Sequence, residues 1–100
     1  MIRVQIDSRK PTNHVTIEGH AGYGVSGTDI VCASVSSILI TTINAMLRVD
    51  EKSIQVEQKE AYVKLDVLVH SDIIDLLMEN MISLLEELER DYKKYVKINK

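Results

Sequence analysis

Residues 19–36, GHAGYGVSGTDIVCASVS, join a β-like run of sequence to a helix-like run. This stretch contains all four glycines, the single cysteine and one of the three histidines of the 100-residue chain. Glycines followed by Thr28 and Asp29 are typical of a strand that leaves through a loop and enters a capped helix. The pattern therefore predicts that His20 leaves a strand and that Cys32 lies near the start of a helix.

The position of Cys32 matters for its chemistry. A thiol attacks as its thiolate, and the first turn of a helix favours negative charge through its unpaired N–H groups and the helix dipole. The dipole contributes only about 0.3–1 kcal/mol, so a base such as His20 has to supply the remaining stabilisation of the thiolate. In a Cys–His pair the imidazole takes the thiol proton and later protonates the leaving amine. The competing interpretation is a buried, unreactive Cys32, because a lone cysteine is usually a small core residue.

Three further residues of the stretch are candidates for supporting roles. Asp29 can cap the helix, or it can orient His20 as the third member of a triad does. Ser36 lies one helical turn beyond Cys32, where it either packs or hydrogen-bonds near the site. Tyr23, an aromatic residue within a glycine loop, can line a substrate pocket. The backbone N–H groups around Cys32 are the expected donors to an oxyanion.

The segment from Gly22 to Gly27 also matches the G-x-G-x-x-G pattern of dinucleotide-binding loops. That fold needs βαβ units in a parallel sheet, whereas the segments that follow here are expected to pair as a hairpin. Gly22 and Gly24 are therefore interpreted as part of a lid over a substrate. A single cysteine cannot build a cysteine-based zinc site, and neither a cofactor nor a metal is expected.

Hydrophobic periodicity predicts an α+β fold with the order ββαββαβ, in which two helices pack on a mostly antiparallel or mixed sheet. The expected strands are residues 2–7, 14–19, 53–58, 61–69 and 95–98, with a loop at 21–28 and helices over roughly 29–48 and from a Ser71–Asp72 cap to about Leu88. The first helix is apolar on most sides. We therefore expect it to be buried, with one face on the sheet and another on a further element such as a second copy of the chain.

Length and composition predict one soluble domain spanning residues 1–100. The net charge of −3 provides no basic footprint for nucleic acid, so no direct nucleic-acid partner is expected. The apolar stretch from Ile30 to Leu47 contains several serines and threonines and is bounded by Asp29 and Arg48, which favours a buried helix over a membrane span. A lone free thiol is typical of the reducing cytoplasm.

The combination of GHA at residues 19–21, G-x-D-I-V-C-A at residues 27–33 and Ser36 resembles the ribosomal-processing cysteine protease family, called Prp. The resemblance extends over the whole chain. It implies a cytoplasmic, homodimeric cysteine endopeptidase that removes the N-terminal extension of a large-subunit ribosomal protein, the twenty-seventh in the customary numbering. The alternative is a non-catalytic, ribosome-associated binding or assembly domain.

The resemblance also assigns roles by position. The histidine of GHA is His20, the implied general base, and the cysteine of D-I-V-C-A is Cys32, the implied nucleophile. The motif positions with supporting roles are Gly19, Gly27, Asp29 and Ser36. The loop departs from the family in carrying Gly24, which creates the G-x-G-x-x-G match.

Overall fold

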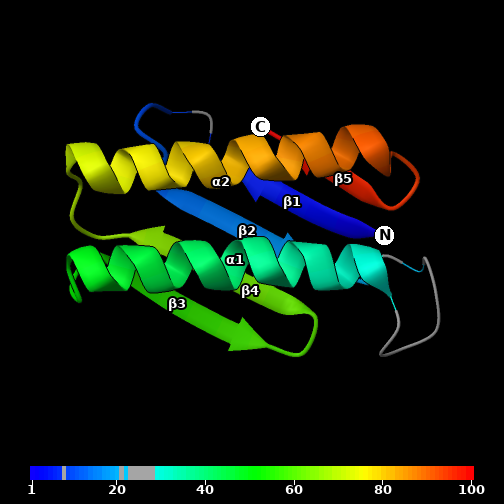
Figure 1. Ribbon diagram of the computed structural model, residues 1–100, viewed down its shortest axis with the longest axis horizontal. Helices are drawn as coiled ribbons and strands as arrows, with labels where there is room; N and C mark the ends of the chain where they lie inside the picture. The colour runs from blue at the N-terminus through cyan, green and yellow to red at the C-terminus, as the bar shows by residue number, and fades with distance from the viewer. Residues whose placement is uncertain (8, 21, 23–28) are drawn as a thin grey trace.

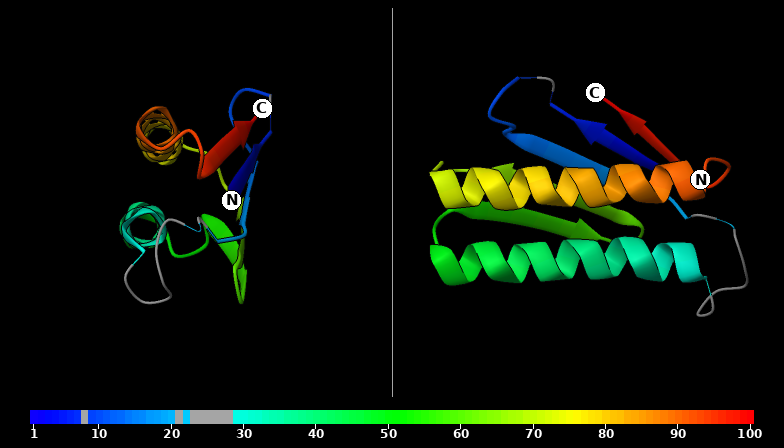
Figure 2. Two further views of the ribbon diagram at one scale, coloured as in Figure 1. Left: turned by 90° about the vertical axis from the view of Figure 1, so that its right-hand side faces the viewer. Right: turned by 45° about the horizontal axis from the view of Figure 1, so that its top comes forward.

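Five strands form one sheet, and both helices cover the same face of it in the computed structural model (Figures 1 and 2). The structure describes residues 1–7, 9–20, 22 and 29–100. In chain order the elements are β1 (Ile2–Ile6), β2 (His14–Glu18), α1 (Ile30–Val49), β3 (Ile54–Lys59), β4 (Tyr62–Val67), α2 (Asp72–Asp91) and β5 (Val96–Asn99). The predicted α+β class and the predicted order of elements are confirmed, with ends that differ by at most three residues.

The sheet is mixed, with the strand order β3-β4-β2-β1-β5. β1 and β5 run parallel, and the pairs β1–β2, β2–β4 and β3–β4 are antiparallel. β3 and β4 pair as the predicted hairpin. This order differs from the doubly wound parallel sheet of dinucleotide-binding folds, which removes the structural context that the G-x-G-x-x-G match requires.

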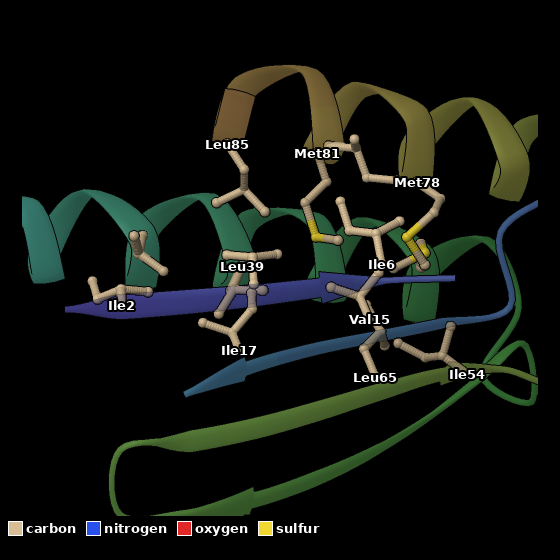
Figure 3. Close-up of a cluster of buried hydrophobic side chains, with 14 of the residues drawn as sticks. Ile2, Ile6, Val15, Ile17, Leu39, Ile54, Leu65, Met78, Met81 and Leu85 are labelled. Carbon is tan, nitrogen blue, oxygen red and sulfur yellow. The ribbon is translucent and has the colours of Figure 1, made fainter. Parts of the chain in front are cut away.

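The core lies between the sheet and the two helices. Alternation along β1 buries Ile2, Val4 and Ile6 on the helix side, while the residues between them are exposed. Figure 3 shows side chains of α2, among them Met81 and Leu85, directed toward the sheet. The two helices also pack against each other, so one continuous apolar layer holds both helices to the sheet.

Helix α1 is only partly buried, in contrast to the predicted buried helix. One stripe of five residues packs into the core: Val31, Val35, Leu39, Thr42 and Met46. The opposite side remains open, with Ile40 59% and Leu47 39% exposed. By length and composition α1 is apolar enough to cross a membrane, and 28% of that stretch is buried within this chain. Its buried stripe is that of a core helix, and its exposed side lacks a partner element within the described part of the chain.

The second half of the chain follows the prediction closely. Ser71 Oγ accepts a hydrogen bond from the Ile74 amide at 3.2 Å, which confirms the predicted cap of α2. The expected continuation of β4 to Val69 is wrong, because the amides of both Leu68 and Val69 donate to the Ser53 carbonyl and end the regular ladder. Val69 is consequently 47% exposed.

Candidate active site

A pocket of about 290 Å³ lies where the first half of α1 meets the ends of β2, β3 and β4. It contains four of the predicted site residues: Gly19, His20, Cys32 and Ser36. The other described residues that line it are Ile2, Ile17, Val35, Leu39, Gln58, Lys59, Ala61, Tyr62 and Val63. Residues far apart in sequence thus form one cavity with a mostly apolar wall and a thiol and an imidazole at its surface.

Gly19 sets the path of the chain into His20. Its φ of 98° is a conformation that L side chains rarely adopt, and a Cβ at this position would lie 2.3 Å from the Met1 carbonyl oxygen. The Gly19 amide donates to the Ala61 carbonyl at 2.9 Å. Position 19 therefore requires glycine, and the backbone before His20 is fixed against both the N-terminal residue and the β3–β4 hairpin.

Cys32 lies in the first turn of α1, as predicted, and its side chain is half-buried. Asp29 is the N-cap, and its Oδ1 accepts hydrogen bonds from the amides of Val31 at 2.9 Å and Cys32 at 3.0 Å. The capping role of Asp29 is confirmed, whereas its role in orienting His20 stays a prediction. In this structure the Asp29 carboxylate accepts from both of these amides, and their role as oxyanion donors stays a prediction.

Sequence reasoning missed the contribution of the β3–β4 hairpin to the pocket. Gln58 and Lys59 end β3, and Tyr62 and Val63 begin β4. No local motif marks these residues, because they reach Cys32 only through the pairing of β4 with β2. The one available signal is the short connection at residues 60–61, which places the strand ends on either side of it at the same edge of the sheet.

The predicted lid is described only at Gly22, whose φ is 71° and whose Cβ position has open space around it. Tyr23, Gly24 and Gly27 lie outside the described residues, so their assigned roles stay predictions. Among the described residues no three His, Cys, Asp or Glu side chains are placed to hold a metal ion.

A half-buried cysteine at a helix start and a histidine at a strand end, both lining one pocket, are the groups that a cysteine peptidase requires. Comparison with known families agrees with this class. The family described as cysteine protease Prp matches residues 1–97, and the chain belongs to this family of cysteine proteases.

Individual relatives extend the comparison. The ribosomal processing cysteine protease Prp of Staphylococcus aureus strain Mu50 is 30% identical over 105 residues, which cover 99% of this chain and 98% of the relative. The protein of the same name from Bacillus subtilis strain 168 is 30% identical over 87 residues, covering 80% and 78% of the two chains. The crystal structure of S. aureus Prp with a covalently linked product peptide has a TM-score of 0.92 and 25% identity, with 99% and 98% coverage. The resemblance inferred from the motifs is therefore confirmed.

Proposed function

We propose that this chain is an endopeptidase that removes the N-terminal extension of a large-subunit ribosomal protein, the twenty-seventh in the customary numbering, in the cytoplasm. The observation that carries the proposal is the shared pocket: Cys32 and His20 line one cavity together with Gly19 and Ser36. Relatives that share 30% of the sequence are named ribosomal processing proteases. The structure with a TM-score of 0.92 to this chain holds a covalently linked product peptide, which supports a peptide as the substrate.

In the proposed reaction His20 accepts the Cys32 Sγ proton while the sulfur attacks the carbon of the scissile carbonyl. The tetrahedral intermediate collapses to a thioester on Cys32, and His20 returns the proton to the departing amine. Water, deprotonated by His20, then hydrolyses the thioester and regenerates the thiol. The apolar wall formed by Val35, Leu39 and Val63 holds a substrate side chain beside the reacting carbonyl.

Oxyanion stabilisation in this scheme depends on Asp29. The amide of Cys32 is bonded to the Asp29 carboxylate in the structure, and a developing oxyanion competes for the same donor. When the oxyanion replaces the Asp29 carboxylate as acceptor, the Cys32 amide remains hydrogen-bonded at each stage. Asp29 thus holds the donor in place until the substrate oxygen replaces the carboxylate.

A homodimer is part of the proposal. The exposed side of α1 carries Ile40 and Leu47 and contains no charged residue between Ile30 and Leu47. An uncharged side with exposed large apolar residues is typical of an interface. We assign it to a second copy of the chain, in agreement with the sequence-based expectation.

The alternative, a non-catalytic binding domain, requires a thiol that is shielded in the core. Cys32 is half-buried and lines the pocket, which favours the protease. Iodoacetamide separates the two functions: in the protease Cys32 is alkylated in the folded protein, at a rate that falls in His20→Ala. A binding domain with a shielded thiol reacts only on unfolding.

The deciding experiment incubates the extended ribosomal protein with the wild-type chain, Cys32→Ala and His20→Ala, and determines the new N-terminus by mass spectrometry. We expect the wild type to trim the extension, Cys32→Ala to leave it intact, and His20→Ala to lose about 100-fold or more in rate. His14→Ala is the matched control, since His14 is an exposed strand residue paired with Asp66 on the far side of the sheet from the helices. An intact substrate with the wild type, or cleavage by Cys32→Ala, would remove the proposal.

A further inference from the structure

Strand β3 forms one edge of the sheet, and no described element pairs with its outer side. Except for Ile54, all its residues are exposed. In Figure 1 its outer side faces away from the rest of the sheet along its full length. The strand therefore presents a row of backbone groups to the surroundings, which is the usual template for an added strand.

The printed hydrogen bonds fix which of these groups point outward. The Leu68 amide donates to the Ser53 carbonyl at 2.7 Å, and these two residues continue the register that pairs Ile54 with Val67. In an antiparallel ladder the residues that bond to the partner strand alternate with residues whose groups point away. The N–H and C=O groups of Val56 and Gln58 therefore point away from β4.

The opposite edge of the sheet is closed. The amide of Ile98 in β5 donates to Glu89 Oε2 of α2 at 2.7 Å. β5 also has only four residues. A side chain thus occupies an outward donor on β5, whereas β3 has six residues, of which only Ile54 is buried.

The open edge leads directly into the pocket. Gln58 and Lys59, the last residues of β3, line the same cavity as Cys32 and His20. A peptide that extends β3 by pairing with Val56 and Gln58 is consequently led toward the thiol in an extended conformation. Extended backbone is also the form in which alternate side chains reach one face, here the face that carries the apolar pocket wall.

We propose that the outer edge of β3 is the docking strand for the substrate polypeptide, which adds to the sheet by backbone hydrogen bonds to Val56 and Gln58. This inference rests on the proposed protease function for its substrate, but it makes its own claim about binding. It predicts that affinity depends on backbone amides on both partners and only weakly on the side chain at position 56.

The first test compares Val56→Pro with Val56→Ala. Proline removes an outward N–H that an edge strand can spare, whereas alanine shortens the side chain and keeps the N–H. For a synthetic peptide covering the extension and the cleavage junction, we expect Val56→Pro to raise KM by roughly 2- to 10-fold with little change in kcat, as loss of one backbone hydrogen bond implies. Val56→Ala should raise KM less than Val56→Pro does. Equal KM values for the proline variant and the wild type would overturn the docking strand.

The second test changes the peptide and leaves the sequence of β3 unaltered. In a series of peptides, each N-methylated at one backbone position, binding to Cys32→Ala is measured by fluorescence anisotropy. We expect losses at every second position, the signature of one paired strand edge. Losses without this period would refute the proposal. Because the readout is binding, it stands apart from cleavage, so failure of the protease function and failure of the docking strand are distinguished.

The same edge could instead join two copies of the chain. Size-exclusion chromatography with light scattering separates the cases, since a docking strand for substrate leaves the oligomeric state of Val56→Pro equal to that of the wild type. A change of oligomeric state in this variant would assign the edge to self-association and overturn the proposal.

Discussion

The carboxylate of Asp29 illustrates how one residue serves both the fold and the site. It caps α1 through the amides of Val31 and Cys32, and Cys32 is the proposed nucleophile. We expect Asp29→Ala to lower the free energy of unfolding by about 1 kcal/mol, while Asp29→Asn, which retains a capping oxygen, stays within a few tenths. Urea denaturation measures both.

The asparagine variant also isolates the charge. If Asp29 acts as a cap alone, Asp29→Asn keeps kcat/KM within about threefold of the wild type. A loss of 100-fold or more in a stably folded Asp29→Asn would instead assign the carboxylate to the orientation of His20.

Asp7, at the end of β1, links stability to pH. The hydrogen bond from the Arg9 amide to Asp7 Oδ1, at 3.1 Å, lowers the pKa of this carboxyl below its usual 3.8, and the Arg9 side chain adds to the effect. A lowered folded pKa means that the folded protein binds fewer protons than the unfolded chain. The stabilisation is therefore present above pH 3.8 and is lost as pH falls through the lowered value.

We expect Asp7→Asn to flatten the pH dependence of the unfolding free energy below pH about 4, measured by urea denaturation at several pH values. Arg9→Ala is the control, because it keeps the backbone N–H that is the main cause and should retain most of the dependence. An unchanged pH profile in Asp7→Asn would show that this contact does not persist in solution.

At the scale of elements, the β3–β4 turn lines the pocket and also holds a residue in an unfavourable backbone conformation. Ala61 adopts a φ of 55° in the two-residue connection between the strands, a region that costs an L residue roughly 1 kcal/mol. Ala61→Gly should therefore raise the free energy of unfolding by about that amount. Glu60→Gly, at a neighbouring residue whose φ is not positive, should bring no gain. Chemical denaturation of both variants tests the difference.

The elements themselves were largely predictable because their signals are local. Asp29 and Ser71 are capping residues that precede apolar periodic runs, and Val15 and Ile17 alternate with polar neighbours in a strand. Of the residues that line the pocket, the sequence predicted only those that belong to the motif, namely Gly19, His20, Cys32 and Ser36. Tyr62 and Gln58 join Cys32 through strand order, and Gly19 meets Met1 through a close approach of two backbones. Both depend on long-range pairing that no window of sequence encodes.

At the scale of the molecule, the proposed dimer buries the open side of α1. A charge at its centre should prevent burial against a second copy, so we expect Ile40→Glu to convert the proposed dimer to a folded monomer. Leu68→Glu introduces the same charge at another exposed apolar position, just after β4, and should leave the dimer intact. Light scattering after size-exclusion chromatography decides between them. A dimer that persists in Ile40→Glu would place the interface elsewhere.

The pocket has walls contributed by residues as far apart as Ile2 and Val63. During synthesis Cys32 and His20 leave the ribosome before the hairpin that completes the cavity, and closure of a loop of some sixty residues must precede formation of the pocket. An unfinished chain therefore lacks the hairpin wall of this pocket, although it already carries Cys32 and His20. In the proposed protease, translation order delays cleavage until the growing polypeptide has folded.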